Sequence, residues 1–187
     1  MRHAKMVLSA LCLVVTGWLG TAEAFDAFLF IPGFQGEAGN AQHKNWIILH
    51  EVSWGHTNAG TANFGGGGGS LGRAQFQEVL VQKLLDSASL ALATAVATGQ
   101  HFPNAIIELV KSGGDPQLFA RLELTDVMIT AYAYEAKAAA GGQTLDPVES
   151  IKLSFSKIVW IYIPQNQAGK AGAPIRGGWD LNANTKL

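Results

Sequence analysis

The stretch ESIKLSFSKIVWIYI, Glu149–Ile163, shows the clearest alternation of apolar and polar residues in the chain. Successive side chains of a β-strand point to opposite faces, so this period of two predicts one long strand. One face carries Ile151, Leu153, Phe155, Val159, Ile161 and Ile163. The other carries Lys152, Ser154 and Ser156, followed by Trp160 and Tyr162. Large aromatics on a polar face suit a subunit interface, so Trp160 and Tyr162 are candidate interface residues.

Other parts of the chain also have β patterns. Strands are predicted in AFLFI (27–31), WIILHEVSW (46–54), NAIIELV (104–110) and the run 118–134. The apolar parity changes between Phe76 and Val79, which predicts a bulge near Gln77. DSASLALATAVATG (86–99) predicts one helix, with Asp86 or Ser87 as its N-cap and Gly99 as its C-terminal cap. Many short strands with glycine turns and one helix favour a mainly β fold, a barrel or a sandwich.

The first 24 residues have the layout of a secretory signal peptide. Arg2 and Lys5 precede an apolar run, Met6–Gly20, and the segment ends in Ala22-Glu23-Ala24. We therefore expect residues 1–24 to be removed and 25–187 to form a single domain, with an uncleaved anchor as the alternative. The single cysteine, Cys12, lies in the leader, so the remainder has no disulfide or thiolate metal site.

The formal net charge of the 187 residues is only −1. Such a balance gives no electrostatic attraction for nucleic acid or for anionic lipid. We expect neither a nucleic-acid partner nor stable membrane insertion once the leader is removed.

The segment NFGGGGGSLGR, Asn63–Arg73, contains five consecutive glycines. A dinucleotide-binding loop would need a helix after it, and the pattern here predicts a strand. A catalytic elbow around Ser70 fails for the same reason. Glycine is costly to order, and it suits a backbone that must lie close to another surface. Two readings remain, a segment that packs on another molecule and a flexible linker.

The remaining polar residues do not form a recognisable active or metal site. His50 and His56 share a strand parity but would lie about 20 Å apart, too far for one metal ion. His43 and His101 stand alone, and the acidic pairs Glu123 with Asp126 and Asp146 with Glu149 are not placed as facing carboxylates. The sequence thus predicts no catalytic residue, metal or cofactor.

The chain resembles Hcp, the haemolysin-coregulated protein that forms the tube of the type VI secretion system. The resemblance spans Asp26 to Leu187 and rests on the order and spacing of several motifs. They are DAFLFIPGFQGEA, EVSWG followed by the glycine run, TGQHFPNA, KSGGDPQ, ESIKLSFSKIVWIYIPQ and GGWDLNANTKL.

This resemblance implies a compact barrel of two β-sheets with one flanking α-helix. It also implies hexameric rings that stack into a hollow tube, with spike and sheath proteins as partners and effector proteins carried and chaperoned in the lumen. The family's loop between the second and third strands corresponds to Thr57–Gly72 and would pack neighbouring subunits and rings. Its residues in question are Asn63, Phe64, Gly65, Gly66, Gly67, Gly68, Gly69 and Ser70.

By the same resemblance Ser53 would face the lumen and contact cargo. The family has no cofactor and no catalytic residues, and the protein would be found outside a Gram-negative cell. A leader departs from the family pattern, because the tube assembles in the cytoplasm. Either the start site is misassigned, or the chain crosses the periplasm on its own.

Two other functions compete with the tube protein. A secreted monomeric β-barrel could bind a ligand through Trp54, Trp160 or the glycine run. A hydrolase that uses Ser70 is the weaker alternative, because no partner residue is placed beside that serine.

Overall fold

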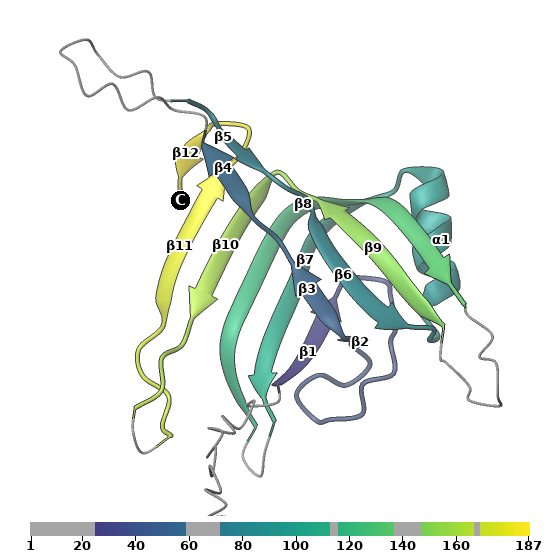
Figure 1. Cartoon of the computed structure of the whole chain (residues 1–187), viewed down its shortest axis with the longest axis horizontal. Coiled ribbons are helices and arrows are strands. Elements are labelled where there is room, and N and C mark those ends of the chain that lie inside the picture. Colours follow the sequence, from purple (N-terminus) through teal and green to yellow (C-terminus); the bar gives the residue numbers. More distant parts are fainter. Residues whose placement is uncertain (1–24, 59–71, 113–115, 137–146, 167–168) are drawn as a thin grey trace, which may run out of the picture.

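The computed structural model describes residues 25–58, 72–112, 116–136, 147–166 and 169–187 (Figure 1). The expected leader and the glycine run lie outside these residues. The described chain is mainly β and forms two sheets beside one helix, as predicted. Its elements are β1 (Phe25–Phe30), β2 (Ile47–Leu49), β3 (Glu51–Ser53), β4 (His56–Asn58), β5 (Ala74–Phe76), β6 (Val79–Leu84), α1 (Ser89–Thr98), β7 (His101–Lys111), β8 (Gln117–Glu135), β9 (Val148–Ser154), β10 (Lys157–Tyr162), β11 (Ile175–Asp180) and β12 (Thr185–Lys186).

Ten strands form one antiparallel sheet that branches at β8. One part follows the order β12-β11-β10-β8-β7-β1-β2, and the branch continues from β8 through β9 and β6 to β3. Over the described residues, the sheet is not hydrogen-bonded into a closed barrel. Two of its three end strands, β2 and β3, are separated in sequence only by His50, whose amide donates to the Gln82 carbonyl oxygen at 2.7 Å. The chain therefore folds the sheet around a core at this corner.

β8 is the long strand on which the two branches meet. β9 and β10 both pair with it, with Ser154 opposite Met128 and Lys157 opposite Thr125, and the β8–β9 register shifts between Ile129 and Ala131. The predicted single strand is thus two strands that lie end to end along β8. β8 bends at Asp126, which has a φ of 53°. The β9–β10 chain bends beside it at Ser156, whose amide donates to the Thr125 carbonyl oxygen at 2.9 Å.

This bend corrects the predicted faces of the stretch from Glu149 to Ile163. Ile151 and Leu153 are fully buried, as the alternation suggests. Beyond the bend the fully buried residue is Ile158, whereas Val159 and Ile161 are only half-buried. Trp160 consequently lies on the same strand face as Ile158, the core side, and not on a polar face.

Residues 46–54 also differ from a single uninterrupted strand. The pattern predicts one strand, but His50 separates β2 from β3, which pair with β1 and β6 respectively. The buried parity in β2 is that of Ile47 and Leu49, while Ile48 is 41% exposed. Likewise, the predicted bulge at Gln77 is a break between β5, in the two-stranded sheet with β4, and β6 in the large sheet.

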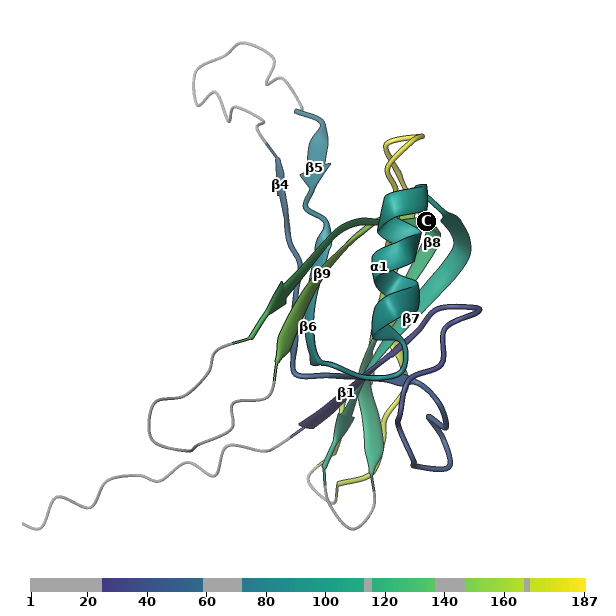
Figure 2. The ribbon, with the colours of Figure 1, turned by 90° about the vertical axis from the view of Figure 1, so that its right-hand side faces the viewer.

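The main core is aliphatic and fills the space inside the folded sheet. α1 packs against this core through Leu92 and Ala95 (Figure 2). Burial of these apolar side chains provides the main driving force for folding. The largest fully buried aliphatic side chains are Leu29, Ile31, Ile47, Leu92, Ile107, Leu124, Ile129, Ile151, Leu153 and Ile158.

Helix α1 ends as the sequence predicts, but its N-cap lies one residue after Ser87 and two after Asp86, the two predicted candidates. Gly99 adopts the left-handed conformation at the C-terminus, with a φ of 63°. The N-cap is Ala88, and Asp86 Oδ1 accepts a hydrogen bond from its amide at 2.9 Å. Within the described part of the chain, no helix is long and apolar enough to cross a membrane.

Candidate assembly and cargo surfaces

The outer face of β3, β6 and β9 is a polar surface that contains Ser53. Ser53 pairs with Leu80, and Leu80 pairs with Lys152 on the next strand. The adjacent row consists of Glu51, Gln82 and Ser150 in the same order. Ser53, Glu51 and Lys152 are exposed. Hydroxyl groups and one charge on each side strand, with the Gln82 amide between them, give a surface that can hydrogen-bond to varied protein partners.

Strands β4 and β5 form an arm that projects from the large sheet (Figure 2). Asn58 pairs with Ala74 at its outer end, and the chain between them contains the glycine run. The candidate residues Asn63 to Ser70 therefore lie outside the described residues. Next to this outer pair, Arg73 Nη2 donates to the Leu181 carbonyl oxygen at 2.7 Å and ties the start of β5 to the segment that follows β11.

Five aromatic rings stack where the arm joins the body. His56 lies between Phe76, at 4.8 Å between ring centroids, and Trp160, at 6.1 Å. Trp54 stacks on Trp160 at 5.7 Å, and Phe76 contacts Trp179 at 6.5 Å. All of these rings except Trp54 border a cavity of about 380 Å³. The sequence singled out Trp54 and Trp160, but only the fold brings them to His56, Phe76 and Trp179.

A glycine in β11 makes room for this stack. Gly177 lies opposite Trp160, and a Cβ atom placed on Gly177 would lie only 2.8 Å from Trp160 Cε2. The indole therefore lies flat against the Gly177 backbone, an approach that a side chain would block.

Tyr162, the second predicted interface aromatic, is separate from the stack. It lies at the end of β10 and is 53% exposed. Its partner across the β10–β11 ladder, Ile175, is 61% exposed. Large neighbouring apolar groups that remain in water are a feature of protein–protein contact sites.

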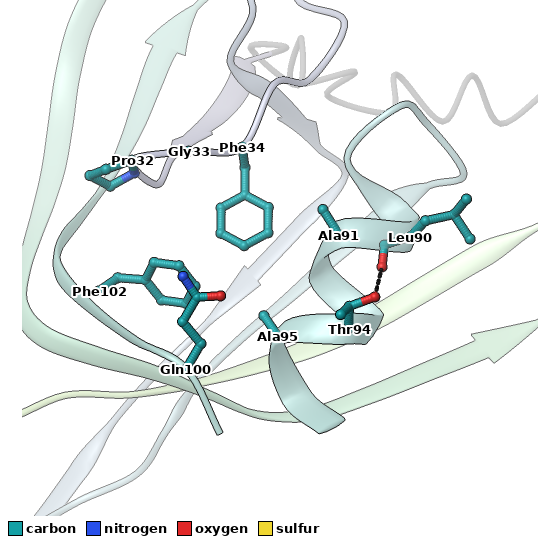
Figure 3. A pocket seen from close by; sticks show the side chains of 9 residues that line it. All are labelled: Pro32, Gly33, Phe34, Leu90, Ala91, Thr94, Ala95, Gln100 and Phe102. Carbon is teal, nitrogen blue, oxygen red and sulfur yellow. Dashed lines mark hydrogen bonds between the residues drawn. The ribbon is translucent and has the colours of Figure 1, made fainter. Parts of the chain in front are cut away.

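The outer face of α1 is a second exposed apolar surface, which sequence reasoning missed. The helix SLALATAVAT contains no charged residue, and Leu90 is 83% exposed. Beside it lies a cavity of about 350 Å³ between the helix and the turn after β1 (Figure 3). The lining includes Pro32, Phe34, Leu90, Thr94, Gln100 and Phe102. The absence of charged residues from this segment is the sequence signal that could have indicated an exposed apolar helix face.

A buried polar cluster fixes α1 to the sheet. Lys83 Nζ is fully buried and contacts Glu149, Asp86 Oδ1 at 2.7 Å and Ser89 Oγ at 2.9 Å. Tyr132 donates its hydroxyl proton to Glu149. Burial, followed by the hydrogen bond to Glu149, raises the pKa of the Tyr132 hydroxyl well above its usual range. These contacts connect β6, β8 and β9 to the start of α1.

A second buried cluster anchors the loop before β2. His43 is 3% exposed; its Nε2 lies 2.6 Å from Glu108 Oε2, and its Nδ1 lies 3.1 Å from Asn40 Oδ1. Its ring stacks on Phe28 with centroids 4.2 Å apart. Among the described residues no three His, Cys, Asp or Glu side chains could hold a metal ion. His43 is therefore a structural histidine in this fold.

The comparisons with known proteins agree with this architecture. Residues 28–162 match the family model described as type VI secretion system effector, Hcp. Protein hcp1 of Pseudomonas aeruginosa is 29% identical over 116 residues, which cover 61% of this chain and 69% of that protein.

Solved structures give the same result over more of the chain. A type six secretion system protein is 34% identical with a TM-score of 0.80, covering 88% of this chain and 100% of that one. Hcp1 from Salmonella typhimurium is 26% identical with a TM-score of 0.68, covering 88% and 99%. The strand order, the single helix and the matched residues lead to one conclusion: this chain belongs to the Hcp family of type VI secretion system proteins.

Proposed function

We propose that this chain assembles into hexameric rings, that the rings stack into a hollow tube, and that the tube carries and chaperones effector proteins. The observation that carries the proposal is the fold, which matches a type six secretion system protein over 88% of the chain. The exposed apolar surfaces on α1 and at the end of the β10–β11 ribbon support assembly, because they need a partner to cover them. Spike and sheath proteins are the expected partners of the tube.

The oligomeric state tests the ring directly. We expect the purified protein, processed or expressed without residues 1–24, to have six times the mass of one chain and to appear as rings by negative-stain microscopy. A chain that stays monomeric at high concentration would contradict the ring.

The polar face of β3, β6 and β9 is the proposed cargo surface, with Ser53 as a contact residue. Ser53→Gln adds bulk at the β3 edge of this face, so we expect rings to form normally but to retain less cargo protein from the producing bacterium. Ala41→Gln, in the exposed loop before β2, is the matched control and should keep the cargo. Equal cargo retention by both variants would mean that the cargo surface does not include Ser53.

The role is structural, and the proposal includes no catalytic residue and no cofactor. The glycine run, Asn63 to Ser70, is proposed to pack on neighbouring subunits or rings.

The leader is proposed to direct periplasmic transit before the protein leaves the cell. Mass spectrometry of the exported protein tests this, because a mature N-terminus at Phe25 requires cleavage after Ala24.

A monomeric binding module is the second candidate, favoured by the aromatic cavity of about 380 Å³ beside Trp160 and Trp179. It predicts a monomer whose tryptophan fluorescence changes in a saturable way with a ligand. Rings with unchanged fluorescence would leave the tube as the only supported function.

A further inference from the structure

We propose that the aromatic cavity beside the arm binds a small planar aromatic anion, such as an aryl carboxylate. The cavity has a volume of about 380 Å³, and its lining comes from β4, β5, β10, β11 and β12 (Figure 1). This inference gives a ligand class to the site behind the second candidate function. It applies to rings and to single chains alike, since one chain supplies the lining that carries it.

The aromatic part of the lining favours a flat ligand. Its four rings are His56, Phe76, Trp160 and Trp179. The planes of neighbouring rings are nearly parallel, with 16° between His56 and Phe76, 19° between His56 and Trp160, and 27° between Phe76 and Trp179. Parallel rings extend their stack to a further flat ring, because offset stacking brings one π face against another.

Two donors on one side of the cavity lack an acceptor. Lys186 of β12 lies directly opposite Trp179 of β11, so their side chains are neighbours on one face of the ribbon. Lys186 is exposed and makes no ion pair or hydrogen bond with the described residues. The Trp179 indole N–H is buried and likewise finds no acceptor among them. A carboxylate is the strong acceptor for such a pair of donors.

The charges around the cavity decide between an anion and a cation. Aromatic faces on their own attract cations. A cation here would meet the ammonium group of Lys186, and over the described residues no acidic side chain lines the cavity to balance it. Asp180, the acid next to Trp179 in the chain, is held by Lys157 Nζ at 2.8 Å. The cavity therefore favours a ligand with a negative charge.

Calorimetric titration with three small probes tests the ligand class. The protein, processed or expressed without residues 1–24, is titrated with 2-naphthoate, with its neutral analogue 2-naphthylmethanol, and with cyclohexanecarboxylate, which has the charge without the flat ring. We expect saturable binding of one 2-naphthoate per chain, at least about tenfold tighter than either analogue, because each analogue lacks one recognised feature. Equal affinities for the three probes, or no binding of 2-naphthoate at millimolar concentration, would overturn the proposal.

Two substitutions locate the bound anion in the cavity. Lys186→Met removes the charge, so it should lower the 2-naphthoate affinity by about tenfold and leave the 2-naphthylmethanol affinity unchanged. Lys152→Met, on the exposed face of β9, is the matched control and should change neither affinity. Ala74→Leu fills the cavity and should abolish the binding of both probes, whereas Ala41→Leu, in the exposed loop before β2, should not.

The outcomes separate this site from the proposed function. Rings that bind no 2-naphthoate would overturn the site and leave the tube in place. Single chains that bind it with the expected preference would support the site and contradict the ring. If Lys186→Met keeps the preference for 2-naphthoate over 2-naphthylmethanol, or loses it no more than Lys152→Met does, the anion is not held in this cavity and the site is overturned.

Discussion

At the residue scale, the fold depends on a few polar side chains placed inside it. Lys83 is fully buried, and its ammonium group lies among the acceptors of Glu149, Asp86 and Ser89. Charges in this position stabilise a fold only as a complete set, since each lone member would be an unpaired charge away from water. The cluster connects β6, β9 and the start of α1, so it places the helix on the sheet.

Lys83→Met should therefore destabilise the protein by about 3–5 kcal/mol, because it leaves Glu149 and Asp86 without their cation. Urea unfolding followed by tryptophan fluorescence measures the loss. Lys152→Met, on the exposed face of β9, is the matched control and should change stability by less than about 0.5 kcal/mol. Similar losses for the two variants would mean that the buried cluster contributes little.

Asp180 makes the stability of the C-terminal strands depend on pH. The Ala183 backbone amide, which donates to Asp180 Oδ1 at 2.9 Å, and then Lys157 lower the pKa of this carboxyl group. The folded-state pKa lies below the unfolded one. The contribution of Asp180 is therefore present above its ordinary value near 4 and is lost as the pH falls through the folded pKa.

Asp180→Asn should accordingly flatten the acid side of the stability curve. Urea midpoints measured from pH 6 down to pH 2 should fall less steeply in this variant than in the natural protein. Glu51→Gln, a change on the exposed face of β3, is the control. If the natural protein and Asp180→Asn lose stability in parallel, the carboxylate does not carry this dependence.

At the element scale, the aromatic stack that joins the arm to the body depends on Gly177, which has no side chain and lies opposite Trp160. Gly177→Ala would place a methyl group against the indole of Trp160 and force the ring to move. We expect a loss of about 1–3 kcal/mol from this overpacking, together with a shift in tryptophan emission. Gly39→Ala is the matched control, since a Cβ there meets nothing within 4 Å. A stable Gly177→Ala protein with unchanged emission would contradict the described packing.

At the scale of the whole molecule, the charge-free outer face of α1, proposed as an assembly surface, predicts how assembly responds to salt. Contacts between exposed charges weaken as ionic strength rises, because the screening length falls from about 10 Å at 0.1 M to about 3 Å at 1 M. Apolar contacts do not weaken in this way. Rings should therefore have the same mass in 0.1 M and 1 M sodium chloride when measured by mass photometry. Dissociation into single chains at 1 M would indicate ionic contacts instead.

The sequence by itself determined most of the strand segments and the helix, but it did not predict β4, β11 or β12. Apolar residues two apart predicted β structure over Glu149–Ile163, and Gly99 predicted the helix end, because these signals are local. Motif order predicted the family for the same reason. Ser53 was placed on a strand, and the structure puts it on an exposed face, while its contact with cargo stays a prediction.

Only the tertiary structure decided which faces are buried and which surfaces are left open. The shared bend of β8 and its neighbours placed Trp160 on the core side, where an unbroken alternation predicted the polar side. The partners of Lys83 and of His56 come from strands far apart in the chain, and no local pattern connects them. The physical reason is that burial depends on what packs against a strand from elsewhere in the chain, whereas the strand itself depends on its own residues.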